Sequence, residues 1–435
     1  MHEPVGCELL RLPWKGTRRA NWLGAIALGL TAILAVLSLF PAWIAPPAQP
    51  TPASTEIRGV WLTNVASGVL FVPWGVNRAI WELAKLDFNT IYPVVWNRGH
   101  TFYPSAVARR ATGRSQDGLL WLTHPFSDPL RNLVRQAHHQ NLRVIPWFEY
   151  GFMAPANAAI ARRHPDWLAM RRDGSTTLRE GSPEVQLHEL GEADPEAQTV
   201  GQRLQASLTR PFRNDLVWLN PLHPAVQKFL LTLIVEVVIE YDIDGIQLDD
   251  HFGLPVSFGY DPITVELYRQ DHDGISPPDN PRHPEWVRWR ADRISDFMQR
   301  LVNAIEAVSP DCQISLSPNP SDYAYRHYLQ DWSNWVERGW LDEVIVQVYR
   351  NSNASFEAEL AQETIRSARD RIPVGIGILS GTWNNPVEAD RIARQVRTVR
   401  DRGFDGVSFF YWESLWGYIA PESPRARRRA FKGLF

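Results

Sequence analysis

The sequence predicts an α/β fold, a (β/α)8 TIM-type barrel that follows one N-terminal transmembrane helix and a Pro-rich linker. Three observations support this prediction. From residue 56 onward, short apolar runs alternate with segments of helical spacing, and the alternation recurs eight times. Near the N-terminus stands an uncharged apolar segment of membrane-spanning length. Ten residues rich in Pro then separate this segment from the alternating part.

The composition fits one large globular unit. The chain has 435 residues, of which 44% are hydrophobic and 21% charged, so it can bury a sizeable core. An α/β barrel uses about 250 residues or more as one unit, which leaves room for insertions. The formal charge of −3 argues against a nucleic-acid partner, because dedicated binders are strongly basic. Two cysteines, Cys7 and Cys312, cannot form a disulfide framework.

Residues 21–45 are predicted to be a signal anchor in the inner or plasma membrane. The segment is long enough to span a bilayer, and Trp22 and Trp43 stand at its two ends, where interfacial aromatic residues belong. Four basic residues precede it, so the rest of the chain is expected on the extracytoplasmic, periplasmic side. The alternative is secretion after signal cleavage, although the apolar region of a cleaved peptide is usually only about 7–15 residues long.

The chain is therefore expected to have five parts. The linker should be extended and semi-rigid because it is Pro-rich. The C-terminal tail carries five basic residues and one acidic residue, and we interpret it as a solvated last turn rather than a contact with phospholipid or acidic wall polymer. The parts are a cytoplasmic basic segment (1–20), the anchor (21–45), the linker (46–55), the barrel (56–420) and the tail (421–435).

The first elements of the barrel follow from hydrophobic spacing. Residues 58–63 (RGVWLT) form an apolar run typical of a strand, and apolar residues recur at helical spacing in 76–86. The second strand is predicted at 90–96 (TIYPVVW) and the next helix at 128–140. The third strand, 143–149 (RVIPWFE), is again a short apolar run.

The remaining elements repeat this pattern. A strongly apolar helix at 224–241 precedes the fourth strand, 245–249 (GIQLD), and a helix at 284–308 precedes the fifth strand, 313–317 (QISLS). The last three helix–strand pairs are 331–338 with 343–349, 356–370 with 373–379, and 387–401 with 406–410. Two polar stretches are expected as long loops, 171–215 and 251–280. An open doubly wound sheet is the alternative fold, but no GxGxxG or Walker-type loop supports a nucleotide site.

A barrel carries its chemistry at the C-terminal ends of its strands. In this sequence those positions hold carboxylates, amides and aromatic rings, the mixture that binds a sugar through stacking and hydroxyl hydrogen bonds. The candidates for substrate binding or catalysis are Asn97, Arg98, Trp147, Glu149, Gln247, Asp249, Asp250, His251, Tyr349, Arg350, Trp383 and Glu413.

The fourth strand holds the best candidate for a catalytic carboxylate. Side chains alternate across a strand, so Ile246 and Leu248 should pack outward while Gln247 and Asp249 face the barrel axis. Asp250 follows at the rim. The alternative is that the two aspartates only cap the following loop through its backbone amides.

Glu149 is the second candidate. The same alternation places it inward with Trp147, and an inward Glu beside an indole has the raised pKa that a general acid needs. The alternative is a salt bridge to Arg98.

A metal site is an alternative interpretation of the same residues. Asp249, Asp250 and His251, together with His100 or His124, offer oxygen and imidazole ligands. The sequence has neither an HExxH motif nor a GxSxG elbow, so we expect no metal, no other cofactor and no Ser nucleophile.

The strand-end motifs resemble the glycosyl-hydrolase-like family ten. The matching stretches include RGVWLTNVASGVL, FNTIYPVVWNRGHTFYPS, VIPWFEYGF, HPDWLA, WLNPLHPAV, YDIDGIQLDDHFGLP and SLSPNP, and they extend over about residues 57–418. The resemblance implies an extracytoplasmic glycoside hydrolase with cell-wall glycan as a substrate. It implies that Asp249 and Asp250 match the acidic pair of the fourth strand, and that Glu149 matches the Glu of the WFEYGF motif. In amylase-like barrels the acid is a Glu on strand five, which QISLSPNP lacks.

From these residues we expect a two-carboxylate glycosidase acting on a polysaccharide. Asp249 is expected as nucleophile or base and Glu149 as the acid, with Asp250 as its substitute. One alternative is a non-catalytic glycan-binding barrel that tethers the envelope to the wall. Another is a polysaccharide deacetylase or lyase, which would need a metal or a Tyr or Lys base.

Overall fold

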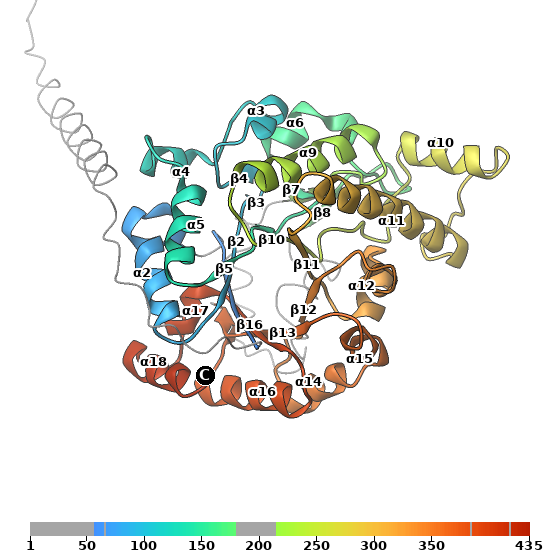
Figure 1. Cartoon of the computed structure of the whole chain (residues 1–435). Helices are drawn as coiled ribbons and strands as arrows, with labels where there is room; N and C mark the ends of the chain where they lie inside the picture. Colours follow the sequence, from blue (N-terminus) through green and yellow to red (C-terminus); the bar gives the residue numbers. More distant parts are fainter. Residues whose placement is uncertain (1–55, 65–66, 180–214, 383–384, 417–418) are drawn as a thin grey trace, which may run out of the picture.

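The computed structural model describes residues 56–64, 67–179, 215–382, 385–416 and 419–435 (Figure 1). The predicted basic segment, anchor and linker lie outside these ranges. Within them, no helix combines the length and the apolar character that crossing a bilayer requires.

Nine parallel strand segments form one curled sheet. In the order of their pairing they are β5 (Arg143–Val144), β2 (Thr90–Pro93), β1 (Ile57–Leu62), β16 (Gly406–Phe410), β13 (Val374–Leu379), β12 (Glu343–Gln347), β11 (Gln313–Ser317), β10 (Gly245–Asp249) and β6 (Trp147–Phe148). Each lies within a predicted strand or begins one residue before it.

The two edges of this sheet belong to one stretch of chain. β5 and β6 are separated only by Ile145 and Pro146, and Trp147 forms a parallel bridge with Val94 beyond the end of β2. On the other side, Trp147 is in register with Gln247 of β10. The sheet therefore curls until both edges meet at residues 143–148, which is consistent with the expected TIM-type barrel.

The helices surround the sheet as an outer layer (Figure 1). The principal ones are α2 (Pro73–Ala84), α5 (Pro129–His139), α9 (Pro224–Glu240), α11 (Pro284–Glu306), α13 (Trp332–Glu337), α14 (Asn353–Leu360), α15 (Glu363–Arg369) and α16 (Ala389–Asp401). Several begin with Pro, whose fixed φ and missing N–H suit the first helical position. The predicted single helix 356–370 is wrong: Gln362 takes an extended backbone and separates α14 from α15.

The two long polar stretches contain more structure than expected. The segment after β6 forms a small antiparallel sheet of β7 (Met153–Pro155), β9 (Asp215–Trp218) and β8 (Thr177–Arg179). The loop predicted at 251–280 includes α10 (Pro262–Asp271), which the Asp261 carboxylate caps by accepting from the backbone N–H of Thr264. α3 (Ala106–Thr112) and α4 (Gly118–Thr123) lie between β2 and α5.

The basic C-terminal segment differs from the predicted solvated tail. It forms α18 (Pro424–Lys432), which packs against α16 and α17 (Trp412–Trp416). Phe431 and Arg427 are fully buried. The tail is held because the Arg427 guanidinium donates to four backbone oxygens, those of Ser380, Val387, Ser414 and Leu415. The barrel therefore continues past the predicted boundary at residue 420.

A polar layer fills the barrel interior beneath the strand ends. Glu343 accepts hydrogen bonds from Tyr92 and Ser315 and pairs with Arg143 at 2.7 Å. Above it, the Gln247 amide accepts from the indole N–H of Trp61 at 2.7 Å and donates to Ser315 at 3.0 Å. These satisfied buried groups form the floor on which the strand-end residues stand.

Candidate active site

Glu149 follows β6 and lies at the C-terminal end of the barrel. Its Oε2 accepts from the Thr63 hydroxyl at 2.9 Å and from the Asn97 amide. The side chain is buried, and burial raises its pKa to about 7 although both hydrogen bonds favour the ionised form. Glu149 is thus a carboxyl group that can exchange a proton near neutral pH.

The end of β10 supplies the second acidic group. Asp249 and Asp250 are both buried, and the Gln347 amide of β12 donates to Asp249 Oδ1 at 2.7 Å. Asn319, which follows β11, donates to Asp250 Oδ2 at 3.1 Å. Groups from β12 and from the segment after β11 therefore hold the two aspartates in place. Asp249 reaches β12, two strands away in the sheet, so its side chain faces the barrel interior as predicted.

His251 joins the two acidic groups. Its Nδ1 lies 3.0 Å from Asp250 Oδ1, 3.7 Å from Asp249 Oδ2 and 3.1 Å from the backbone oxygen of Glu149. Its ring stacks on Tyr150 at a centroid distance of 5.8 Å. The imidazole therefore links the segment after β6 to the segment after β10.

Burial and mutual charge set the protonation of this cluster. Burial and the adjacent Asp250 raise the pKa of Asp249 well above its ordinary value. Burial opposes protonation of His251, but the two aspartates outweigh it and raise its pKa well above 6.5. A protonated His251 lies 3.0 Å from Asp250 Oδ1 and compensates one negative charge of the cluster.

Aromatic rings line the acidic cluster. Trp147 packs against Trp61 and Phe410 with centroid distances of 6.1 and 6.4 Å, and Tyr349 lies 5.7 Å from Phe410. Burial, followed by the charges of Asp249, Asp250 and Glu149, raises the pKa of Tyr349 well above its ordinary value. Tyr349 therefore stays a neutral phenol beside the acids.

Two residues predicted to bind substrate, Gln247 and Arg350, are bonded to other parts of the protein. Gln247 is fully buried and its amide is engaged by Trp61 and Ser315, so it belongs to the floor rather than to a substrate-contacting surface. Arg350 is half-buried and pairs with Glu359 of α14 at 2.7 Å.

The remaining predicted binding residues have different surroundings. Arg98 donates to the Tyr150 hydroxyl at 3.3 Å, so it lies next to the ring that stacks on His251. Glu413 accepts from Ser67, and burial raises its pKa to about 7. Trp383 lies outside the described residues.

The sequence assigned no role to Thr63, Gln330 or Gln347. Thr63 shares the inward face of the first strand with Trp61, and Gln347 ends β12, so strand alternation could have identified both as inward. Gln330 donates to the backbone oxygens of Asp249 and Phe252 from a loop, and no periodic pattern marks that position.

The acidic cluster has the spacing of a possible metal site, because one ligand atom from each of Asp249, Asp250 and His251 lies within 4.8 Å of the others. Neither His100 nor His124 belongs to this group among the described residues. His251 Nδ1 faces both carboxylates and a backbone oxygen within this group.

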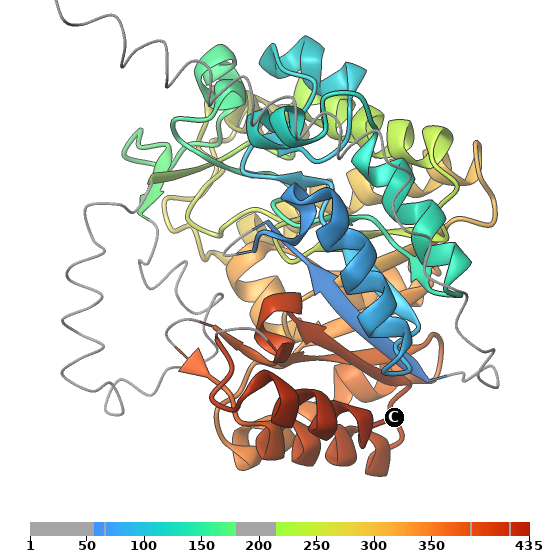
Figure 2. The same ribbon diagram turned by 90° about the vertical axis from the view of Figure 1, so that its left-hand side faces the viewer.

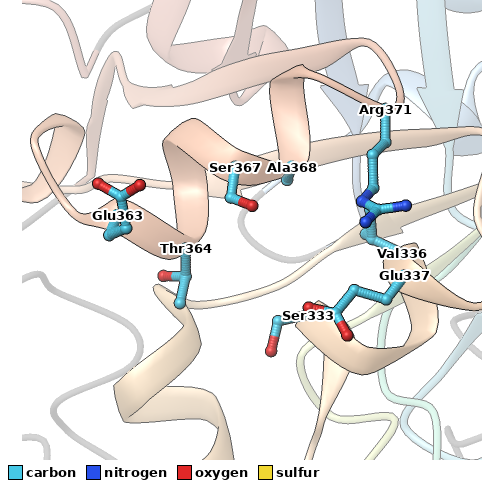
Figure 3. A pocket seen from close by; sticks show the side chains of 8 residues that line it. All are labelled: Ser333, Val336, Glu337, Glu363, Thr364, Ser367, Ala368 and Arg371. Carbon is cyan, nitrogen blue, oxygen red and sulfur yellow. The ribbon is translucent and has the colours of Figure 1, made fainter.

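A cavity of about 180 Å³ lies in the outer helical layer, between α13 and α15 (Figure 3). Ser333, Val336, Glu337, Glu363, Thr364, Ser367, Ala368 and Arg371 line it. None of the strand-end acids is among these residues, so the cavity is separate from the acidic cluster.

The raised pKa of Glu149 predicts a pH-dependent stability. Its folded pKa of about 7 exceeds the ordinary 4.5, so the folded state binds this proton more tightly than the unfolded state. This proton stabilises the folded state fully below pH 4.5, and the stabilisation is lost as pH rises to about 7. At 1.36 kcal/mol per pKa unit, the loss in unfolding free energy is about 3 kcal/mol. Urea unfolding of Glu149→Gln across this range should lack that loss. An identical pH slope in the variant and the parent chain would contradict it.

Comparison with known proteins places these features in a family. A model described as Glycosyl hydrolase-like 10 matches residues 56–202 and 183–396. The chain is 23% identical over 389 residues to "Glycosyl hydrolase DigH" of Escherichia coli strain K12, covering 80% of this chain and 79% of that protein. It is 21% identical over 336 residues to "Glycosyl hydrolase YngK" of Bacillus subtilis strain 168, covering 68% and 54% respectively.

Solved structures show a similar fold. The PgaB (BpsB) glycoside hydrolase domain from Bordetella bronchiseptica matches with a TM-score of 0.57 at 13% identity, covering 88% of this chain and 99% of that domain. The catalytic domain of β-amylase from Paenibacillus polymyxa matches with a TM-score of 0.54 at 9% identity and the same coverage.

Proposed function

Because the chain belongs to the glycosyl hydrolase-like 10 family, we propose that it is a glycoside hydrolase that cleaves a polysaccharide by a two-carboxylate mechanism. The observation that carries the proposal is the buried acidic cluster at the C-terminal ends of β6 and β10. Glycosidases mostly use one carboxyl group as acid and a second as nucleophile or base. Glu149 and Asp249 are the two groups proposed for these roles.

Hydrogen bonds and pKa directions bear on the division of roles. Glu149, with a pKa of about 7, can donate a proton at neutral pH, as the predicted acid must. Asp249 must be ionised to act as nucleophile or base, yet burial and Asp250 favour its protonated form. This observation favours a second division, in which Asp249 donates the proton and Glu149 acts as the base.

The pH dependence of kcat/KM separates the two divisions. With Glu149 as the acid, kcat/KM should fall as pH rises through about 7, because the free enzyme loses the proton that it must donate. With Glu149 as the base, kcat/KM should instead rise through the same pH. A Glu149→Gln variant should lose that limb and about 10²–10⁴-fold in rate. A limb that persists in the variant would exclude Glu149 from both roles.

The proposed substrate is cell-wall glycan on the extracytoplasmic side. One support is the expected anchor at 21–45, whose basic flank predicts that the barrel lies on the extracytoplasmic side of the membrane. The other is the mixture of acids and aromatic rings at the strand ends. The full chain should release reducing ends from peptide-free wall glycan, compared in parallel with other polysaccharides. Binding in a pull-down with no release from any substrate would favour the non-catalytic glycan-binding alternative.

The anchor is tested separately. The full chain should remain with membranes after alkaline carbonate extraction and keep the mass of the uncleaved polypeptide. Release of a shortened chain would instead show signal cleavage and secretion.

A further inference from the structure

An exposed apolar cluster lies on the flank of α2 and α4. Among the described residues, eight large apolar side chains are exposed, and five of these lie between residues 74 and 126. α4 packs on the short helix η1 (Val69–Phe71), which leads directly into α2, so the start of α2 and α4 belong to one region (Figure 2). We call the five residues the apolar patch: Trp74 (55% exposed), Leu119 (52%), Trp121 (61%), Leu122 (49%) and Phe126 (74%).

α4 is unusual for a surface helix. Its six residues, GLLWLT, include no charged side chain, and only Leu120 is buried. Leu119, Trp121 and Leu122 are thus presented to water. Several large apolar side chains exposed within one region of a surface indicate a site of contact with a protein or a membrane.

Exposed basic residues precede and follow α4 in the chain, and the Arg114 guanidinium lies beside Gly118, the first residue of α4. Arg109, Arg110 and Arg114 precede α4 and are exposed, as are Arg131 and Arg135 on α5. An apolar group of Trp, Leu and Phe accompanied by basic residues is the pattern of an interfacial membrane contact, in which the arginines meet anionic headgroups. Sugar binding explains the two Trp but not the two Leu and the Phe.

The length of the predicted linker limits how far the barrel can lie from the bilayer. The ten linker residues 46–55 span at most about 31 Å at ~3.1 Å per residue in an extended, Pro-rich conformation. They join the barrel at Glu56, whose carboxylate pairs with Arg400 at 2.6 Å. With the predicted anchor in the bilayer, the linker therefore keeps Glu56 within about 31 Å of the membrane.

We propose that the apolar patch is a bilayer-contact surface for anionic lipid, an inference that rests on the proposed anchor. The linker enters at the N-terminal end of β1, whereas Trp74 starts α2 at the opposite end of the same flank. When both ends of this flank lie near the bilayer, the barrel axis runs along the membrane plane. The strand ends that carry the acidic cluster then face sideways, parallel to the membrane, rather than toward the bilayer.

The test uses the full chain in vesicles of phosphatidylethanolamine and phosphatidylglycerol with brominated acyl chains. Cys7→Ser leaves only the buried Cys312, so one added cysteine can carry a polarity-sensitive fluorophore. Leu122→Cys probes the patch, and Ile275→Cys is the matched control because Ile275 is also exposed (66%) but follows α10, on the side of the barrel opposite α4 (Figure 1). We expect a blue shift and several-fold stronger bromine quenching at 122 than at 275.

Other results overturn the proposal in distinguishable ways. If the chain is retained in the vesicles but both probes report water, the surface proposal fails and the anchor stands. If the chain is not retained in the vesicles, the anchor proposal fails. Vesicles are then added to the free chain, and if the fluorophore at position 122 still shows no shift, the surface proposal fails as well. A shift at 122 that appears without lipid and grows with protein concentration identifies a second copy of the chain as the occupant.

Discussion

An Asp249→Asn variant is expected to fold normally and to lose about 10³-fold or more in kcat on any polysaccharide that the parent chain hydrolyses. The amide can neither donate a proton nor attack as a nucleophile, so either division of roles between Asp249 and Glu149 gives this result. Folding should survive because Asn keeps the shape of a side chain that accepts one hydrogen bond from Gln347. Reducing-end release under substrate saturation measures the effect.

The matched control is Asp322→Asn on α12 (Ser321–Tyr328). Asp322 also follows a barrel strand, but its side chain is 74% exposed and forms an ion pair with Arg326 of the same helix. This variant should keep the parent kcat. If Asp249→Asn retains full activity while its thermal unfolding is unchanged, the acidic cluster is not the catalytic centre.

An Arg427→Ala variant is expected to lose about 3–5 kcal/mol of unfolding free energy. The guanidinium is fully buried, donates to four backbone oxygens and pairs with Glu422 at 2.8 Å. Alanine would leave those oxygens and the Glu422 carboxylate without this donor, and removing one partner of a buried pair typically costs about 3–5 kcal/mol. Urea unfolding followed by far-UV circular dichroism measures the loss.

Arg429→Ala on the same helix is the control. Arg429 is exposed, so its removal should change the unfolding free energy by less than about 0.5 kcal/mol. Equal effects of the two substitutions would show that α18 contributes only through its general charge.

Sequence periodicity predicted the barrel because its strands are buried on both faces and read as short apolar runs. The strand 245–249 shows this well: alternation placed Asp249 inward, and the structure has it there, bonded to Gln347. The same argument misplaced Gln247 at the substrate surface. Alternation gives the direction of a side chain but not its depth along the barrel, and Gln247 is fully buried with its amide oxygen bonded to the Trp61 indole.

The tail shows a different limit of sequence reasoning. A run of arginines favours a solvated segment, and nothing local distinguishes Arg427 from its exposed neighbours. Its burial depends on carbonyl groups at Ser380 and Val387, which lie about 40 residues earlier in the chain and come close only in the folded barrel. Gln330 was not predicted for the same reason, because its partners are the distant backbone oxygens of Asp249, at the end of β10, and Phe252, in the loop after it.

The meeting of both sheet edges at residues 143–148 has a consequence for how the protein becomes active. Trp147 is in register with Gln247, so the contact between β6 and β10 joins positions a hundred residues apart, and such non-local contacts form slowly. Glu149 and Asp249 stand immediately beyond this closure. A half-formed barrel therefore has neither a paired acidic cluster nor His251 between its segments. We therefore expect the acidic cluster to assemble in the same step in which the sheet closes. A refolding chain should regain activity only when β6 and β10 have paired.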